Sequence, residues 1–217
     1  MVKIVYVGFG IVSQGFAEII LRNNSVIPLA KNQEIQTVGI LDTMKGSKID
    51  ANGINMQQIL ANATDGDYSL LTEHLLNIPK AIQEINADII IEASFTDIKT
   101  GQPARSHIEA ALHSNKHVVT SNKGPVAVSY KHLFKLAKQK GKTLAIEGTV
   151  MSGTPIINVL NNGLLGAGIT AVRGIMNGTS NYILSKMEVG MSYNAALSQA
   201  QKLGYAEADP TSDVEGL

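Results

Sequence analysis

The stretch VKIVYVGFGIVS, residues 2–13, decides the fold. Within it an apolar run from Lys3 to Val7 passes directly into two glycines, and Val12 to Arg22 then shows the apolar spacing of a helix. A glycine-rich turn between a buried strand and a helix lets the backbone approach a pyrophosphate and directs helix N–H groups at it. The stretch therefore predicts the first strand-turn-helix unit of a dinucleotide-binding domain.

The turn departs from the usual three-glycine pattern at one position. Gly8 and Gly10 fit the pattern, but the third position is Ser13, with Gly15 two residues later. A small residue there still lets the helix pack closely on the strand. We therefore expect cofactor binding rather than a plain tight turn, through Gly8, Gly10, Ile11 and Val12.

The rest of the first 146 residues alternates short aliphatic runs with amphipathic segments, which is typical of an α/β fold with a doubly wound, Rossmann-like parallel sheet. Residues 42–70 interrupt the alternation and predict a long loop with a short helix from Met56 to Ala61. The predicted strands after the first are Ile35–Leu41, Asp88–Glu92, His117–Thr120 and Thr143–Ile146, and the further helices are Ala104–Ser114 and Tyr130–Lys140.

The pattern changes after residue 146, so we predict a nucleotide-binding domain over residues 1–146 and the beginning of a second, α+β domain over residues 147–217. In the second domain Gly153-Thr154-Pro155 opens a helix and Ile169–Ile175 is predicted to be a strand. Helices are predicted at Ser180–Met187 and Ala195–Leu203.

Composition narrows the classes of function. The chain has 18 basic and 18 acidic residues, so no net charge favours nucleic acid or a membrane surface, and small molecules or further copies of the chain are the expected partners. No apolar stretch approaches the roughly 20 residues of a membrane span. The absence of cysteine excludes disulfides and thiolate metal sites and suits a cytoplasmic protein.

Two cofactors remain possible from the second predicted strand. Asp42 ends this strand, where a carboxylate can bind the ribose hydroxyls of NAD. Lys45 and Lys48 follow closely and could instead pair with the 2′-phosphate of NADP. A solvated carboxylate without a ligand is the plain alternative for Asp42.

Polar residues follow two further strands, at the carboxyl edge where open α/β sheets bind ligands. Thr96 closes EASFT after one strand, and Ser121 and Lys123 lie in SNKGP after the next. A lysine at this edge is placed to act on a substrate, although it could equally be a surface residue in a turn.

Four longer segments resemble homoserine dehydrogenase: HVVTSNKGP at 117–125, EGTVMSGTP at 147–155, NGTSNYIL at 177–184 and GYAEADPTSD at 204–213. The resemblance covers essentially the whole chain, in the family's order. It implies NAD- or NADP-dependent interconversion of L-aspartate 4-semialdehyde and L-homoserine, on the route to threonine and methionine. It also implies that residues 147–217 begin a substrate-binding and dimerisation domain, so a homodimer is expected.

The resemblance implies roles for individual residues. Thr96 and Ser121 would lie beside the nicotinamide, while Lys123 and Glu207 would be catalytic. A monovalent cation such as sodium would be bound through the Glu147 carboxylate and through Val150, Ser152 and Thr154. The implied substrate-binding residues are Gly178, Thr179, Tyr205, Glu207 and Asp213, where Thr179 can also be a helix cap and the last three can be a polar surface loop.

The family pattern continues beyond Asp213 to an aspartate and a lysine that contribute to catalysis, whereas this sequence ends at Leu217. We therefore expect the chain alone to be weakly active or inactive, either as a fragment or as part of a split enzyme completed by a second chain. Two other functions compete with this one: a different small-substrate NAD(P) reductase, or a cofactor-binding protein without catalysis.

Overall fold

The computed structural model describes residues 1–23, 34–74, 77–206 and 210–215. The chain divides into two compact units, Met1–Thr149 and Val150–Leu217. Each unit is described by itself.

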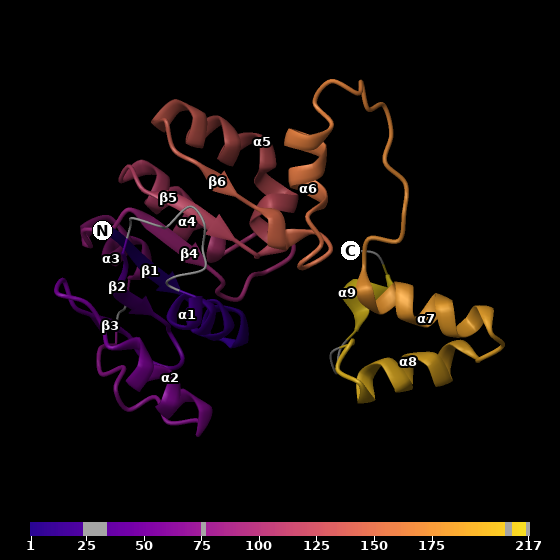
Figure 1. The fold of residues 1–217 in the computed structure, drawn as a ribbon, viewed down its shortest axis with the longest axis horizontal. Coiled ribbons are helices and arrows are strands. Elements are labelled where there is room, and N and C mark those ends of the chain that lie inside the picture. The colour runs from indigo at the N-terminus through magenta and orange to yellow at the C-terminus, as the bar shows by residue number, and fades with distance from the viewer. Residues whose placement is uncertain (24–33, 75–76, 207–209, 216–217) are drawn as a thin grey trace. The chain divides into compact units, whose positions relative to one another are not determined.

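The first unit is built on a six-stranded sheet with the order β3-β2-β1-β4-β5-β6 (Figure 1). Neighbouring strands are parallel except for β2 and β3, which are antiparallel. The strands are β1 Val2–Val7, β2 Ile35–Leu41, β3 Lys48–Ile49, β4 Ile89–Glu92, β5 His117–Thr120 and β6 Leu144–Ala145. This sheet confirms the predicted Rossmann-like α/β fold.

The helices of the first unit connect these strands. Two short elements lie outside the prediction: β3, inside the expected loop, and α3, which begins after the capping side chain of Asn77. The helices are α1 Ile11–Asn23, α2 Met56–Thr64, α3 Ile78–Glu84, α4 Ala104–His113 and α5 Lys123–Lys140, followed by a 3-10 turn, η2, at Glu147–Thr149.

The predicted helix from Tyr130 is corrected by the structure, in which α5 begins at Lys123 and has a kink at Ser129. Gly124 and Pro125 suggested a loop. Proline is tolerated in the first turn of a helix, however, because the N–H groups there have no partner within the helix. The short helix predicted to end at Ala61 likewise continues to Thr64.

The central strands are buried on both faces, which explains their continuous apolar sequences. Ile4 through Val7 of β1 are all buried, and Tyr6 packs edge-on against Phe9 with ring centroids 5.8 Å apart. The order of the strands reverses at β1, which has β2 on one side and β4 on the other. Open α/β sheets bind ligands at the carboxyl ends of the strands at such a switch point.

The regular elements in the described residues of the second unit are all helical: α6 Ile156–Asn158, the π-helical turn η3 Val159–Gly163, α7 Gly178–Glu188, α8 Tyr193–Lys202 and α9 Thr211–Val214. Ile183 of α7 packs with Ala196 and Ala200 of α8 in a small core. The predicted strand Ile169–Ile175 is wrong, since this segment has no strand structure. A strand needs a neighbour for its backbone N–H and C=O groups, and the described part of this unit provides none.

Among the described residues, no helix is both long and apolar enough to cross a bilayer.

Candidate dinucleotide and substrate sites

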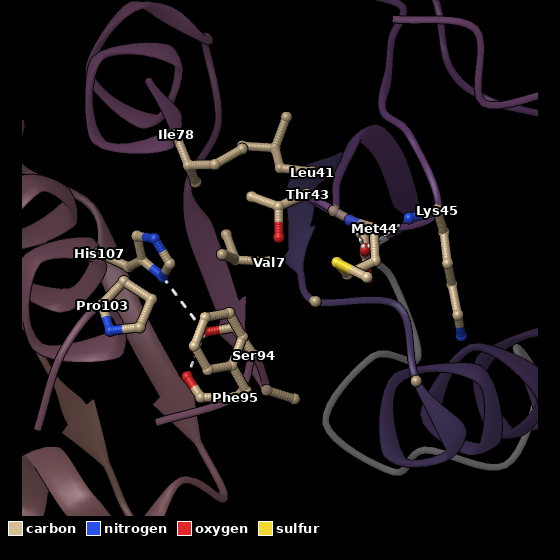
Figure 2. A pocket seen from close by; sticks show the side chains of 14 residues that line it. Val7, Leu41, Thr43, Met44, Lys45, Ile78, Ser94, Phe95, Pro103 and His107 are labelled. Atoms are coloured by element: carbon tan, nitrogen blue, oxygen red, sulfur yellow. Dashed lines mark hydrogen bonds between the residues drawn. The ribbon is translucent and has the colours of Figure 1, made fainter. Parts of the chain in front are cut away.

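A pocket of about 250 Å³ lies in the first unit at the carboxyl ends of β1, β2 and β4 (Figure 2). It therefore occupies the switch point of the sheet. Pro103 and His107 border it from the side of α4, and Met44 and Lys45 from the turn after β2. The lining residues are Val7, Gly8, Gly10, Leu41, Asp42, Thr43, Met44, Lys45, Ile78, Ala93, Ser94, Phe95, Pro103 and His107.

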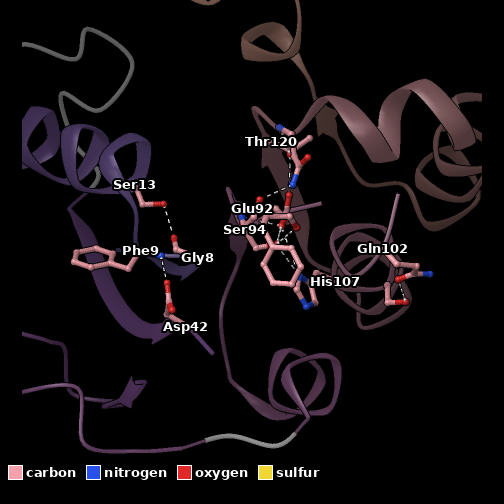
Figure 3. Close-up of polar contacts among 12 residues, drawn as sticks. Gly8, Phe9, Ser13, Asp42, Glu92, Ser94, Gln102, His107 and Thr120 are labelled. Carbon is pink, nitrogen blue, oxygen red and sulfur yellow. Dashed lines mark hydrogen bonds and ion pairs between the residues drawn. The ribbon is translucent and has the colours of Figure 1, made fainter. Parts of the chain in front are cut away.

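At Gly8 the backbone after β1 lies tightly against the backbone after β4. The φ of Gly8 is +81°, and a Cβ added there would lie 2.6 Å from the carbonyl oxygen of Ala93 and from the backbone nitrogen of Ser94. Only glycine fits both this conformation and this space. Ser13, at the position where a third glycine was expected, is fully buried and its hydroxyl donates to the Gly8 carbonyl at 2.6 Å (Figure 3). The serine therefore ties α1 to the turn.

The space beside Gly10 is open. A Cβ built on Gly10 would meet no described atom within 4 Å. Ile11, the first residue of α1, is 90% exposed, and Val12 is exposed as well. Free space in front of a helix N-terminus suits an anionic group, because the first N–H groups of a helix have no acceptor within it.

Asp42 follows β2 in the pocket lining and holds two turns together. Its Oδ2 accepts from the Phe9 N–H at 2.8 Å (Figure 3), and its Oδ1 accepts from the N–H groups of Met44 and Lys45 at 2.8 and 2.9 Å. The carboxylate is therefore fixed before any ligand arrives. A carboxylate has about four acceptor positions, so one at Oδ2 is left for a ribose hydroxyl.

Lys45 stands at the same wall as Asp42. Its Nζ donates to the Phe9 carbonyl at 2.7 Å and lies 4.5 Å from the ring centroid of Tyr68. The nearby Lys45 ammonium and the Gln14 amide lower the pKa of the Tyr68 phenol. Lys48, the other cation considered from the sequence, is in β3 and is absent from the residues that line the pocket.

The ends of β4 and β5 bring Thr96 and Lys123 into one neighbourhood. A Cβ on Gly124 would lie 2.6 Å from Thr96 Cγ2, so the loop after β4 touches the start of α5. Thr96 Oγ1 is buried and has no hydrogen-bond partner among the described residues. Such a hydroxyl costs free energy unless a ligand or water satisfies it. Ser121 follows β5 and is half-buried.

Lys123 is exposed and is the first residue of α5. The N-terminus of a helix carries a partial positive charge, so a cation there is unfavourable for the helix itself. The position of Lys123 is therefore not explained by helix stability.

The predicted substrate residues lie in the second unit, where a hydrogen-bonded group joins α7 to α9. Thr179 Oγ1 lies 2.7 Å from Asp213 Oδ2 and 2.7 Å from the Tyr205 carbonyl. Asn177 Nδ2 donates to Asp213 Oδ1 at 2.7 Å. Gly178 begins α7. Asn177, not Thr179, is the helix cap, since its Oδ1 accepts from the Ser180 N–H. Glu207 lies outside the described residues.

The predicted cation ligands fall on either side of the division between the units. Glu147 belongs to the first unit, while Val150, Ser152 and Thr154 belong to the second. Met151 and Ser152 have φ values of 56° and 51°. In the described ranges, no three or more His, Cys, Asp or Glu side chains group as a metal site.

Sequence reasoning missed two residues at the pocket of the first unit: His107, which lines it, and Glu92, which contacts His107. Glu92 is fully buried at the end of β4, and His107 of α4 lies against it (Figure 3). One signal in the sequence could have found them: Glu92 ends an otherwise apolar strand. A carboxylate is costly to bury without partners, so its position indicates that polar groups surround it.

Comparison with known proteins gives a consistent result for both parts of the chain. Residues 8–147 match the family model described as homoserine dehydrogenase, NAD binding domain. Residues 155–217 match the model described as homoserine dehydrogenase.

The relatives carry the same name. The NAD(+)-dependent homoserine dehydrogenase of Pseudomonas canavaninivorans is 40% identical over 223 residues, which is 99% of this chain and 62% of that protein. A putative homoserine dehydrogenase structure from Archaeoglobus fulgidus has a TM-score of 0.87 and 37% identity, covering 100% of this chain and 64% of that one. A hyperthermophilic archaeal homoserine dehydrogenase in complex with NADPH has a TM-score of 0.80 and 30% identity, covering 99% and 65%. The chain thus spans less than two thirds of each of these relatives.

Proposed function

Because this chain belongs to the homoserine dehydrogenase family, we propose that its first unit binds a nicotinamide dinucleotide and that both units serve the interconversion of L-homoserine and L-aspartate 4-semialdehyde. One observation carries the first part of the proposal. The Gly8 backbone touches the end of β4 while open space lies in front of Gly10 and the N-terminus of α1. This arrangement suits a pyrophosphate at the switch point of the sheet.

The binding roles follow from the pocket. Gly8, Gly10, Ile11 and Val12 hold the pyrophosphate, and Asp42 binds the adenosine ribose. Thr96 and Ser121 lie along the nicotinamide, where the Thr96 hydroxyl, which has no partner in the described part of the chain, gains a hydrogen bond. When bound, the dinucleotide carries the hydride, while the protein supplies orientation and charge.

The catalytic roles rest with two charged residues. The Lys123 ammonium stabilises the negative charge that develops on the substrate oxygen and exchanges a proton with it. Glu207 assists in catalysis and binds the substrate ammonium. Gly178, Thr179, Tyr205 and Asp213 complete the substrate site in the second unit.

We propose NAD rather than NADP as the preferred cofactor. Three backbone N–H groups hold the Asp42 carboxylate in the part of the pocket proposed to bind the adenosine ribose. There its negative charge would repel the 2′-phosphate of NADP. Lys45, which could offset this repulsion, is engaged with the Phe9 carbonyl.

Two further features complete the proposal. A monovalent cation such as sodium binds to oxygen ligands of Glu147, Val150, Ser152 and Thr154, since hard cations prefer oxygen. The working enzyme is a homodimer formed through the second domain. Thermal stability in sodium against choline chloride tests the cation, and analytical ultracentrifugation tests the dimer.

Calorimetric titration with NADH and NADPH tests the cofactor site, and absorbance at 340 nm tests the reaction with homoserine. The reaction is measured on this chain and on a chimera that continues it with the C-terminal part of the Methanocaldococcus jannaschii homoserine dehydrogenase. We expect both proteins to bind NADH, with strong activity in the chimera. Binding without activity in either protein would favour a non-catalytic cofactor-binding role, and absence of binding would contradict the proposal.

A further inference from the structure

A buried carboxylate lies next to the pocket, in contact with two residues of its lining, Ser94 and His107. Glu92 is the last residue of β4 and is 0% exposed. Its Oε1 accepts from the hydroxyl and the backbone N–H of Ser94 at 2.5 and 3.1 Å, and its Oε2 accepts from the Thr120 hydroxyl at 3.1 Å (Figure 3). Glu92 thus joins the ends of two neighbouring strands, β4 and β5.

The hydrogen bonds continue from Thr120 back to Ser94 and form a closed ring. Thr120 Oγ1 accepts from the Asn122 N–H at 2.9 Å, and Asn122 Nδ2 donates to the Ser94 carbonyl at 2.7 Å. We call Glu92, Ser94, Thr120 and Asn122 the strand-end ring. It fixes the relative positions of the two loops that leave β4 and β5.

The stability of the fold does not by itself explain why a carboxylate, Glu92, occupies this buried position. Burying a charged group costs more than burying an apolar side chain of similar size. One basic group lies against the ring: His107 Nδ1 is 3.5 Å from Glu92 Oε1 and 3.3 Å from the Ser94 hydroxyl. The hydrogen bonds that Glu92 accepts come from neutral donors of Ser94 and Thr120.

These two loops carry the residues proposed to meet the nicotinamide and the substrate. Thr96 follows Ser94 by two residues, and Lys123 follows Asn122 directly. The close approach of Thr96 to Gly124 shows that the segment after β4 touches the start of α5. A shift of either strand end would therefore move Thr96 relative to Lys123.

We infer that Glu92 is a positioning residue, which through the strand-end ring sets Thr96 and Lys123 for the nicotinamide end of the cofactor. The inference rests on the proposed function. It separates the two halves of the pocket by their hydrogen bonds. Asp42 and Ser13 hold the glycine turn, where the adenosine and pyrophosphate are proposed to bind, through bonds that do not involve the ring. The turn meets the ring only where the Gly8 backbone packs against Ser94.

Two ligands distinguish the halves. NADH contains the nicotinamide, whereas ADP-ribose has the same adenosine and pyrophosphate without it. Glu92→Gln keeps the shape of the side chain but replaces one carboxylate oxygen with an N–H₂ group. That group would face the hydroxyl of Ser94 or of Thr120, each of which donates a hydrogen bond to Glu92 in the wild type. We expect the affinity for NADH to fall about tenfold, which is the effect of losing one charge-assisted hydrogen bond. The affinity for ADP-ribose should stay within about twofold of wild type, which is the usual scatter for a mutation at an unrelated site.

Matched variants keep the test decisive if Glu92→Gln folds poorly. Thr120→Val removes the link to β5 at nearly constant volume and should show the same selective loss, which Thr120→Ser should rescue. Glu84→Gln, in an exposed pair with Lys80, should change neither affinity.

The outcomes separate this inference from the proposed function. Equal losses for NADH and ADP-ribose in Glu92→Gln and Thr120→Val, or no loss for either ligand, would overturn the positioning role while leaving the proposed cofactor site intact. Failure of the wild-type chain to bind either ligand would overturn the proposed function and this inference with it.

Discussion

The Asp42 carboxylate accepts a hydrogen bond from the Phe9 backbone N–H at 2.8 Å, so the end of β2 holds the glycine turn that follows β1. The same carboxylate organises the turn at Met44 and Lys45. One residue thus shapes two walls of the pocket and presents a negative charge between them. A change at Asp42 should alter both the stability of the turn and the choice of cofactor.

Asp42→Asn should shift the preference from NADH toward NADPH. The amide removes the charge that opposes a 2′-phosphate, and the expected change in the ratio of the two Kd values is about tenfold, as for a modest charge interaction near a surface. Calorimetric titration with both dinucleotides measures this ratio. Asp50→Asn is the control, because Asp50 accepts from the Asn52 N–H in an exposed turn away from the pocket. An unchanged ratio in Asp42→Asn would show that Asp42 does not select the cofactor.

Three glycine-to-alanine changes should separate folding from binding. In Gly8→Ala the positive φ and the 2.6 Å contacts should lower the free energy of unfolding by about 2–4 kcal/mol. In Gly10→Ala the fold should tolerate the methyl group, since no described atom lies within 4 Å of it, but the pyrophosphate should lose its close approach.

Gly15→Ala is the third member of the series. Gly15 lies inside α1, and a Cβ added there would meet no described atom within 4 Å, so alanine should stabilise the helix by about 0.5–1 kcal/mol. Thermal denaturation and NADH titration of all three variants measure both effects. Normal NADH affinity in Gly10→Ala would contradict the placement of the pyrophosphate.

Tyrosine ionisation should be spread over an unusually wide pH range. The Lys45 ammonium and the Gln14 amide lower the pKa of the Tyr68 phenol, while burial raises the pKa of Tyr6. In a titration followed at 295 nm, Tyr68 should ionise first and Tyr6 last. Tyr68→Phe should remove the earliest step, and Lys45→Met should move that step to higher pH. If the early step survives in Tyr68→Phe, another of the six tyrosines is responsible.

The sheet was predictable because its strands are buried on both faces and appear as continuous aliphatic runs. The shorter elements gave weaker signals. β3 has two residues, and α3 has seven with a proline among them. The helix formed by residues 123–129 was hidden by a glycine and a proline that suit a first turn as well as a loop. The segment Ile169–Ile175 has a strand-like composition, but pairing depends on a neighbour that composition cannot reveal.

The pocket was only partly predictable for a related reason. The glycine turn and Asp42 are local features at strand ends. The strand-end ring depends on Glu92 meeting Thr120, 28 residues later in the chain. Nothing near Glu92 in sequence indicates that partner, so its burial follows only from the order of β4 and β5 in the sheet.

The carboxylate of Asp213 should stabilise the second unit before it meets any substrate. Both of its oxygens have partners, Oδ1 in Asn177 and Oδ2 in Thr179, and these residues form the start of α7. Asp213→Ala should therefore free α9 and loosen the first turn of α7, at a cost of about 1–3 kcal/mol for the unsatisfied groups. Hydrogen exchange followed by mass spectrometry should show faster exchange at residues 178–188, where α7 lies. Glu215→Ala, an exposed acidic residue at the end of α9, is the matched control and should leave that exchange unchanged. Equal exchange rates in Asp213→Ala and wild type would contradict this stabilising role of Asp213 and leave only its proposed role in binding substrate.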